Sequence, residues 1–480
     1  MWPTVTLIME NKRLAVLSLF LFTACTAFAQ ATLQQQLSAA FNKLQTDDQC
    51  KYGTVSLTVL DAKTGEQVFA GNPNVGMAPG STMKTVTTIT AYNLLGSNFT
   101  YQTPFGYTGT LTNGTLNGDI VIKGSGDPTL GSWRWATTNR PNILNQLVGA
   151  LKKAGITKIN GRIIGDDSLY GTQAIPDGWI WQDMGTYYGA GVNALCWHEN
   201  QFDINLRTGA VGSPVSVTGS TPAMPYLTFK SELTTGAGGT GDQAYPYLPT
   251  AASNLMYLRG TYANDKAEKS VAAAIPDPAF DMAYRFLDTL KRLGIAINAT
   301  PESSLTLAAK NQPTPVIANN LLNVASPTLG QIVYWTNRKS INLYAEELLK
   351  AMALKANKPA TTNAAVEVLQ NYWKSRGIDP HSMDVADGSG LSPANRITSL
   401  TIATIMQSTR KEAWYNEFYD SLPIYNDMHM KSGSIYHVLA YTGFVTHQGR
   451  ELCFSIMVNN YNGSSSGVRG KMFKVLDVLK

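Results

Sequence analysis

Helical and strand-like patterns alternate at both ends of this 480-residue chain but not in its middle. Near the N-terminus they predict a β-hairpin over 55–70 and a helix from Thr82 to Leu95. Helices are expected again over 328–375, and strands followed by a last helix over 436–480. Between them, Gly, Thr, Asn and Pro are dense and short strands dominate. This order indicates one α/β domain, built from both chain ends and interrupted by a β-rich insertion.

Segment boundaries follow from these changes of pattern. Residues 1–29 are expected to be an export signal, and 30–102 the first segment of the α/β domain. Inserted domains are expected over 103–315, with an inner insert at roughly 190–265, and the second α/β segment over 316–480.

The N-terminus has the three parts of a secretory signal. Lys12 and Arg13 precede the apolar run 14–22, and Ala27-Phe28-Ala29 is a small-x-small cleavage site. The run is too short to span a bilayer, and no later stretch is apolar for long enough. We therefore predict a periplasmic protein without an integral membrane segment. A lipid anchor at Cys25 is disfavoured because Phe22-Thr23-Ala24 matches a lipidation box poorly.

Charge and cysteine content exclude several classes of protein. Removing the signal lowers the formal net charge from +5 to +4, and Lys and Arg are scattered, so no nucleic-acid partner is expected. Cys50, Cys196 and Cys453 remain, an odd number without a C-x-x-C pair, and no H-E-x-x-H occurs. We predict no disulfide framework, no metal and no cofactor.

Three short motifs occur in one order along the chain: Ser81-Thr82-Met83-Lys84, Ser340-Ile341-Asn342 and Lys431-Ser432-Gly433. The first and third motifs each recur once, at Ser408–Lys411 in a polar stretch and at Lys63–Gly65 in the hairpin turn. S-x-N occurs only once. The ordered set is therefore far more specific than any single motif.

The chemistry of these residue types suits acyl transfer. Ser81 would open a helix, near free backbone N–H groups, and Lys84 at i+3 would present its amine on the same face. A lysine shielded from water can lose its proton near neutral pH and act as general base. We expect Ser340 to pass a proton to the leaving amine and Asn342 to bind the substrate backbone.

The third motif supplies groups for the substrate and the transition state. Lys431 and the Ser432 hydroxyl are expected to bind a terminal carboxylate, and Gly433 to let the substrate approach the strand edge. The backbone N–H groups of Ser81 and Ser434 would form an oxyanion hole, in which one donor contributes about 3–4 kcal/mol.

Two other serine-containing segments are less convincing as catalytic sites. Residues 463–467 match G-x-S-x-G, but that mechanism needs a later histidine and none follows His447. In Asp387–Ser392, two glycines flank a serine, which favours a turn over an acidic site.

The ordered motifs resemble the signature of penicillin-binding proteins and serine β-lactamases. Further segments are similar to the type-4, class C low-molecular-mass penicillin-binding proteins: Gly126–Leu130, Gly165–Ser168, Trp179–Tyr188 and Asp387–Ser392. Ser340 lies 259 residues beyond Ser81, which leaves room for the inserted domains of that branch.

This resemblance implies a transpeptidase/β-lactamase-like domain with an antiparallel sheet flanked by helices. It implies a serine D-Ala-D-Ala carboxypeptidase/endopeptidase that acts on peptidoglycan peptides through an acyl-enzyme and is inhibited covalently by β-lactams. It also implies that an Asp of the second domain, here Asp166, binds the free amino group of the substrate's diamino acid; a solvated turn is the alternative for Asp166. A β-lactamase, and a wall-binding or β-lactam-sensing module without turnover, remain the alternative functions.

Overall fold

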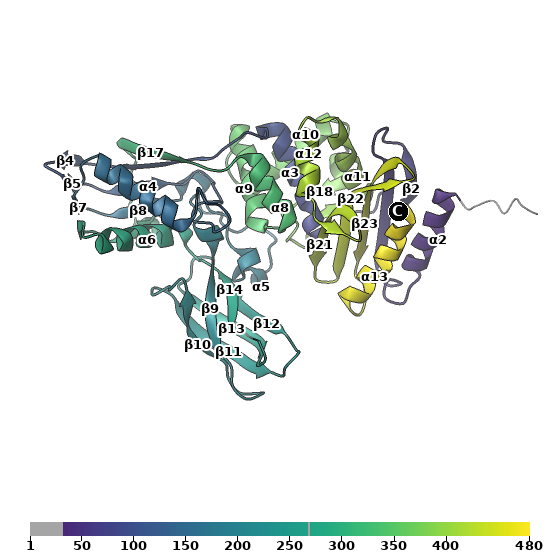
Figure 1. Cartoon of the computed structure of the whole chain (residues 1–480), viewed down its shortest axis with the longest axis horizontal. Coiled ribbons are helices and arrows are strands. Elements are labelled where there is room, and N and C mark those ends of the chain that lie inside the picture. Colours follow the sequence, from purple (N-terminus) through teal and green to yellow (C-terminus); the bar gives the residue numbers. More distant parts are fainter. Residues whose placement is uncertain (1–31, 267–268) are drawn as a thin grey trace, which may run out of the picture.

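The computed structural model describes residues 32–266 and 269–480; the expected signal peptide and Cys25 lie outside them. Figure 1 shows three bodies: a helix-covered sheet on the right, an elongated body on the left, and a small β body below. Among the described residues, no helix is both long enough and apolar enough to cross a membrane.

The right-hand body contains a six-stranded antiparallel sheet in the order β2-β1-β23-β22-β21-β20. Both chain ends contribute to it, since β1 pairs with β23 along its whole length. The strands are β1 (Thr54–Asp61), β2 (Gln67–Gly71), β20 (Ile424–Tyr425), β21 (Met428–Ile435), β22 (Val438–His447) and β23 (Arg450–Asn459).

Helices cover both faces of this sheet. Two of them, α2 (Leu33–Gln45) and α13 (Ser465–Leu476), pack on one face over an apolar core that includes Leu57 and Val59. On the other face, α11 (Ser399–Ser408) contacts the strands directly. A second core also includes α3 (Met83–Leu95), α8 (Leu329–Arg338), α9 (Asn342–Lys355), α10 (Thr362–Ser375) and α12 (Tyr415–Ser421). The short pair β18 (Met383–Asp384) and β19 (Arg396–Ile397) lies beside α10 and α11.

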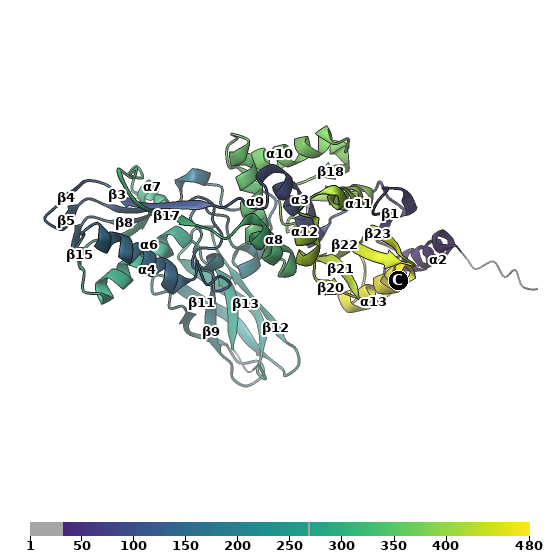
Figure 2. The same cartoon turned by 45° about the horizontal axis from the view of Figure 1, so that its top comes forward.

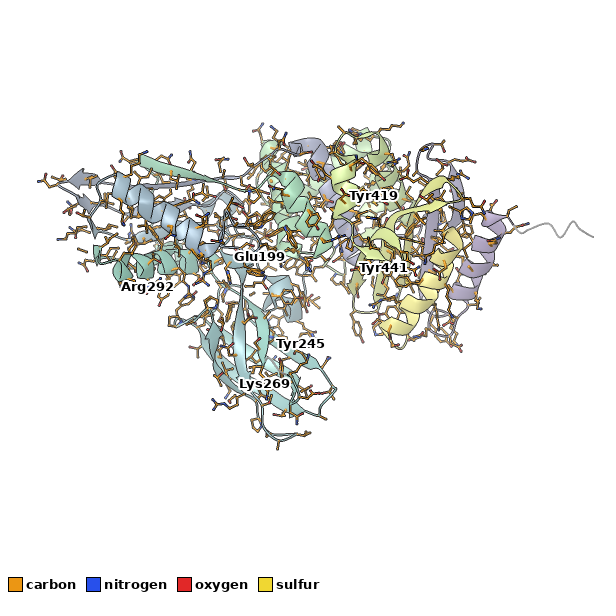
Figure 3. All side chains as sticks on the ribbon, in the orientation of Figure 1. Glu199, Tyr245, Lys269, Arg292, Tyr419 and Tyr441 are labelled. Carbon is orange, nitrogen blue, oxygen red and sulfur yellow. The ribbon has the colours of Figure 1, made fainter. Side chains whose placement is uncertain are left out.

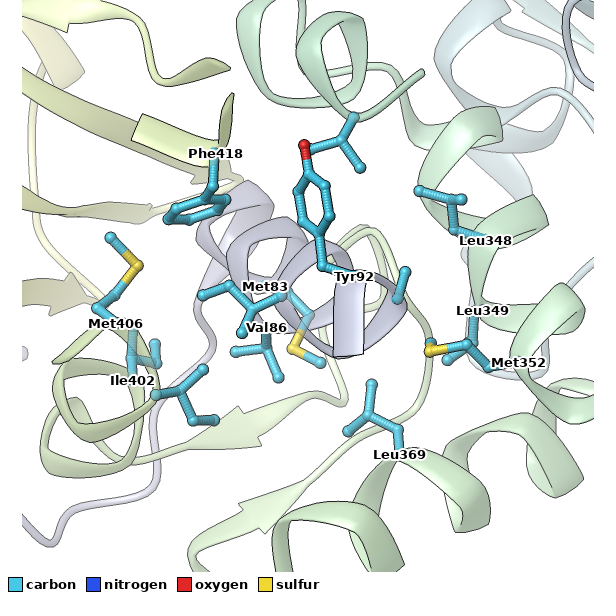
Figure 4. Packing of buried hydrophobic residues seen from close by; sticks show 14 of the residues in the cluster. Met83, Val86, Tyr92, Leu348, Leu349, Met352, Leu369, Ile402, Met406 and Phe418 are labelled. Atoms are coloured by element: carbon cyan, nitrogen blue, oxygen red, sulfur yellow. The ribbon is translucent and has the colours of Figure 1, made fainter. Parts of the chain in front are cut away.

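Helix α3 runs through the middle of the second core, and Figure 4 shows the apolar side chains around it. Its threonines are poor helix formers because β-branching restricts χ1. Here they are buried, and their hydroxyls bond back to the preceding turn, as Thr88 Oγ1 does to Lys84 O at 2.7 Å. Thr87 Oγ1 instead donates to Gly388 O at 2.6 Å, outside the helix. Gly96, at φ 83°, ends the helix as expected.

The left-hand body is built around a five-stranded sheet in the order β16-β8-β6-β3-β17 and a four-stranded sheet in the order β15-β7-β5-β4 (Figure 2). Helices α4 (Arg140–Lys153) and α6 (Pro278–Arg292) bury their apolar faces in its core. Its remaining elements are β3 (Gln102–Tyr107), β4 (Thr110–Thr112), β5 (Thr115–Asn117), β6 (Ile120–Lys123), β7 (Lys158–Asn160), β8 (Ile163–Asp166), β15 (Ala296–Asn298), β16 (Pro301–Ser303), α7 (Ser304–Ala309) and β17 (Asn319–Ala325).

The small body consists of two three-stranded sheets, β10-β9-β14 and β11-β13-β12, around one apolar core. Short helix α5 (Trp181–Met184) lies between it and α9 (Figure 1). The strands are β9 (Gln201–Arg207), β10 (Ser216–Thr221), β11 (Thr228–Gly236), β12 (Asp242–Tyr247), β13 (Leu255–Ala263) and β14 (Ser270–Ala274).

Strand pairing leads us to propose two boundaries that differ from the expected ones. β17 pairs with β3, so the inserted sheet continues to Ala325, beyond the boundary expected at 315. β14 pairs with β9, so the inner sheets occupy 201–274 instead of roughly 190–265. We therefore propose inserted domains over 102–325. Composition does not reveal that β14 and β17 belong to these sheets, because each of them pairs with a strand far away in the sequence.

Candidate active site

The three sequence motifs meet at one end of α3. Ser81 lies in a helical turn, Gly80–Thr82, directly before α3, and Lys84 is in the first turn of that helix. Lys84 Nζ donates to Ser81 Oγ at 2.9 Å and to Asn342 Oδ1 at 2.5 Å. Lys431 Nζ donates to Ser340 Oγ at 2.9 Å. The fold therefore brings together side chains that are 258 residues apart in the Lys84–Asn342 pair.

Lys84 is completely buried, and its amine has three acceptors. The third is the carbonyl oxygen of Ser389, at 2.7 Å. Burial lowers the pKa of Lys84 to about 7, although the carboxylates of Asp387 and Glu346 act in the opposite direction. Two acceptors, an amide oxygen and a carbonyl oxygen, can only accept. A neutral amine would therefore turn its two N–H groups to them and its lone pair to the Ser81 hydroxyl.

The loop that supplies the Ser389 carbonyl is fixed by two buried carboxylates. Glu346 accepts from the backbone N–H groups of Gly388 and Ser389, the latter at 2.7 Å. Asp387 accepts from Gly390 N at 2.7 Å, from Ser392 N at 2.6 Å and from Trp179 Nε1 at 2.9 Å. The turn expected over 387–392 is present, and it additionally positions Lys84.

Ser340 and Asn342 flank the start of α9. Ser340 has φ 57°, in the left-handed region, and Asn342 is the first residue of the helix. Asn342 Oδ1 accepts from Lys84, and Nδ2 donates to the Tyr188 carbonyl at 2.7 Å. The amide thus holds Lys84 in place, a positioning role that adds to the substrate contact expected from the sequence.

Strand β21 places the third motif against the Ser81 turn. A Cβ atom on Gly433 would lie 2.2 Å from Pro79 O and 3.0 Å from Ser81 N, and one on Gly80 would lie 2.7 Å from Ser434 N. The backbone nitrogens of Ser81 and Ser434 therefore lie where the Ser81 turn and strand β21 are in close contact. Gly433 is required by this packing, in addition to any approach of substrate. Ser432 is half-buried and Ser434 is exposed.

Lys431 is buried, and its amine also donates to Ser432 O at 2.8 Å. Burial lowers the pKa of Lys431 well below its ordinary value, and Lys84 lowers it further. A carboxylate bound beside Lys431 would favour the charged form and raise this pKa again.

Asp166 ends β8 and is buried. Its Oδ1 accepts from Ser168 N at 2.9 Å, which ties the carboxylate to its own turn. Binding of a substrate amine by Asp166 stays a prediction. A different carboxylate, Asp183 of α5, accepts from Tyr188 OH at 3.2 Å, and the Tyr188 carbonyl is the one bound by Asn342.

Four contributors were missed by sequence reasoning: the Glu346 carboxylate, the Ser389 carbonyl, Tyr188 and Asp183. For each of them, the sequence contains a feature from which its role could have been inferred. Glu346 lies four residues after Asn342, on the same face of α9. The other three fall in the segments Asp387–Ser392 and Trp179–Tyr188. The sequence shows that these segments resemble the family, but it does not show which contacts their residues make.

Comparison with known proteins identifies the family of the chain. The model of the D-Ala-D-Ala carboxypeptidase 3 (S13) family matches residues 37–477. The chain belongs to the S13 family. The prediction of a serine peptidase of the D-Ala-D-Ala carboxypeptidase type is thereby confirmed.

Individual S13 relatives are distant but cover most of the chain. The D-alanyl-D-alanine carboxypeptidase of Actinomadura sp. (strain R39) is 23% identical over 445 residues, 87% of this chain and 80% of the relative. The D-alanyl-D-alanine carboxypeptidase DacB of Haemophilus influenzae is 24% identical over 419 residues, 82% of each. The crystal structure of penicillin binding protein 4 (dacB) from H. influenzae superposes with a TM-score of 0.76 at 21% identity, covering 92% of this chain and 99% of that one. This likeness confirms the predicted fold class.

Proposed function

We propose that this S13 peptidase is exported to the periplasm and hydrolyses the peptide bond after a D-Ala in peptidoglycan peptides, through an acyl-enzyme on Ser81. The observation that carries the proposal is the contact of Lys84 Nζ with Ser81 Oγ, in a site that also contains Asn342 and is flanked by Lys431. The curated relatives named as D-alanyl-D-alanine carboxypeptidases support the substrate class.

In the first step, Ser81 Oγ attacks the D-Ala carbonyl carbon while its proton passes to Lys84 Nζ. The backbone N–H groups of Ser81 and Ser434 stabilise the resulting oxyanion. The C–N bond then breaks, and the leaving amine takes a proton from the Ser340 hydroxyl. Lys431 Nζ supplies a new proton to Ser340 Oγ through their hydrogen bond. In the second half, water attacks the ester and passes a proton through Ser340 to Lys431. Lys84 returns its proton to Ser81 Oγ as the ester C–O bond breaks, so that both lysines and Ser81 are restored and the shortened peptide leaves with a free carboxyl group.

The burial of Lys84 makes the reaction pH-dependent. Protonated Lys84 cannot accept the Ser81 proton, so the acylation rate is expected to fall about tenfold per pH unit below the pKa of about 7. Above that pH the rate should reach a plateau. Stopped-flow acylation by a chromogenic penicillin between pH 5 and 8.5 measures this; a flat profile would contradict Lys84 as the base.

Asp183 is connected to Asn342 through Tyr188, and we propose that this carboxylate binds a free amine on the substrate side chain. Asp183→Asn is expected to raise KM about tenfold for a peptide with a free side-chain amine and to leave the N-acetylated peptide unchanged. Asp166→Asn is the matched control. If Asp166→Asn alone gives this selective loss, the original prediction from the sequence holds instead.

The test of the proposed function uses purified monomeric and cross-linked muropeptides, with products identified by mass. Loss of terminal D-Ala from monomers indicates carboxypeptidase activity, and conversion of dimers to monomers indicates endopeptidase activity. Acylation by penicillin without either product would indicate a sensing module, and fast multiple turnover of penicillin would indicate a β-lactamase.

A further inference from the structure

The outer face of the sheet β11-β13-β12 carries aromatic side chains where a solvent-facing sheet ordinarily carries polar ones. Tyr257 of β13 pairs with Tyr247 of β12, and Arg259 pairs with Tyr245, so that these four residues share one face. All four are partly exposed. Trp181 of α5, with 46% exposure, extends this aromatic face. Exposed groups of aromatic residues mark binding surfaces.

Arg259 holds the rings of this face together. Its Cζ lies 5.4 Å from the ring centre of Trp181, 5.2 Å from that of Tyr247 and 5.5 Å from that of Tyr257. Glu232 binds the same guanidinium at 2.8 Å. Trp181 Nε1 donates to Leu248 O at 2.6 Å, and its ring centre lies 4.9 Å from that of Tyr247. The rings are therefore ordered before any ligand arrives, which limits the entropy lost on binding.

The aromatic face is continuous with the active site. α5 carries both Trp181 and Asp183, and Asp183 accepts from Tyr188, whose carbonyl binds Asn342. Burial and the neighbouring Asp183 raise the pKa of Tyr188, and Tyr245 acts in the same direction. Tyr245 lies on the side of the small body that faces the right-hand body (Figure 3). A ligand that extends from the catalytic site past Tyr188 would thus meet these rings.

We propose that this aromatic face binds sugar rings of the glycan strand that carries the stem peptide. The inference rests on the proposed function, because only a peptidoglycan substrate brings a glycan to this place. A four-residue stem spans at most about 14 Å, so the sugar of a bound substrate lies within that distance of the reacting carbonyl group. Pyranose rings have apolar C–H faces and hydroxyl rims. They match flat aromatic rings that carry hydroxyl groups and lie beside Arg259 and Glu232.

The test compares two substrates that end in D-Ala-D-Ala: a free stem pentapeptide and the same peptide attached to its disaccharide. Tyr247→Ala is expected to raise KM about tenfold for the disaccharide peptide alone, the effect of losing about one stacking contact. Tyr247→Phe keeps the ring and should behave as wild type. Tyr52→Ala is the matched control, because Tyr52 is 78% exposed and also lies beside a cation, with Lys51 Nζ 5.2 Å from its ring centre.

A binding measurement separates this inference from the proposed function. A tetramer of N-acetylglucosamine is titrated into wild type, Ser81→Ala and Tyr247→Ala, with tryptophan fluorescence as the readout. Binding by wild type and Ser81→Ala, weakened about tenfold in Tyr247→Ala, supports the glycan surface even if no peptide is hydrolysed. Equal binding by all three, no binding, or an equal KM change for both substrates overturns it.

Discussion

Replacing Ser81 by alanine is expected to abolish covalent labelling by fluorescent penicillin and to lower peptide hydrolysis about a million-fold, to background. The hydroxyl is the only group of that side chain that can form the ester. Loss of the catalytic serine in another serine peptidase lowers the rate by about this factor. The variant should fold, because Ser81 Oγ is an acceptor for Lys84, which keeps two other acceptors.

Two other serines provide matched controls for this experiment. Ser408 opens the second S-x-x-K motif, and Ser465 is the central serine of G-x-S-x-G. Ser408 Oγ donates to Ile405 O at 2.7 Å within its own helix, and Ser465 begins α13. Ser408→Ala and Ser465→Ala should label as wild type does. Labelling of Ser81→Ala, or loss of labelling in either control, would place the nucleophile elsewhere.

Gly433→Ala is expected to lower acylation at least 100-fold and the free energy of unfolding by about 2–3 kcal/mol. The added Cβ would lie 2.2 Å from Pro79 O and 2.8 Å from Thr82 N, and both are backbone atoms that cannot rotate away. Strand β21 must move off the Ser81 turn, which separates Ser434 N from Ser81 N and opens the oxyanion hole.

Gly470→Ala is the control for glycine replacement, because a Cβ there meets no atom within 4 Å. In helix α13 this change should leave activity intact and stabilise the protein by about 0.5–1 kcal/mol. Denaturant unfolding and penicillin acylation, measured on both variants, separate stability from activity. If Gly433→Ala acylates at the wild-type rate, the close approach of β21 and the Ser81 turn is not needed for the oxyanion hole.

The local elements of this fold could be predicted because their signals are local. The hairpin β1–β2, helix α3 with its end at Gly96, and strands β22 and β23 all lie close to the expected ranges. Strand β17 was missed because its partner, β3, lies more than 200 residues earlier, and only that pairing identifies it as part of the inserted sheet. Strand β14 likewise pairs with β9, 65 residues earlier in the Ser270–Asn205 pair, and this pairing is the basis of the proposed inner boundary.

Candidate site residues could be predicted where the chemistry requires a particular side chain at a particular spacing. Ser81 and Lys84 share one helical turn, so their contact follows from the spacing alone. Family resemblance points to Asp166, whose carboxylate accepts from its own turn, whereas the Asp183 carboxylate accepts from Tyr188. The spacing of residues within one segment cannot identify a hydrogen-bond partner that lies on a separate segment.

The sequence by itself determined the reacting groups and their order: a serine and a lysine in one turn, then Ser340 and Asn342, then Lys431 before a glycine. The tertiary structure decided how those groups behave. Burial lowers the pKa of Lys84 to about 7, and Glu346 holds the loop whose Ser389 carbonyl orients the amine. The physical reason is that dielectric environment and hydrogen-bond geometry depend on what packs around a residue, and here those neighbours come from α9 and from the 387–392 loop.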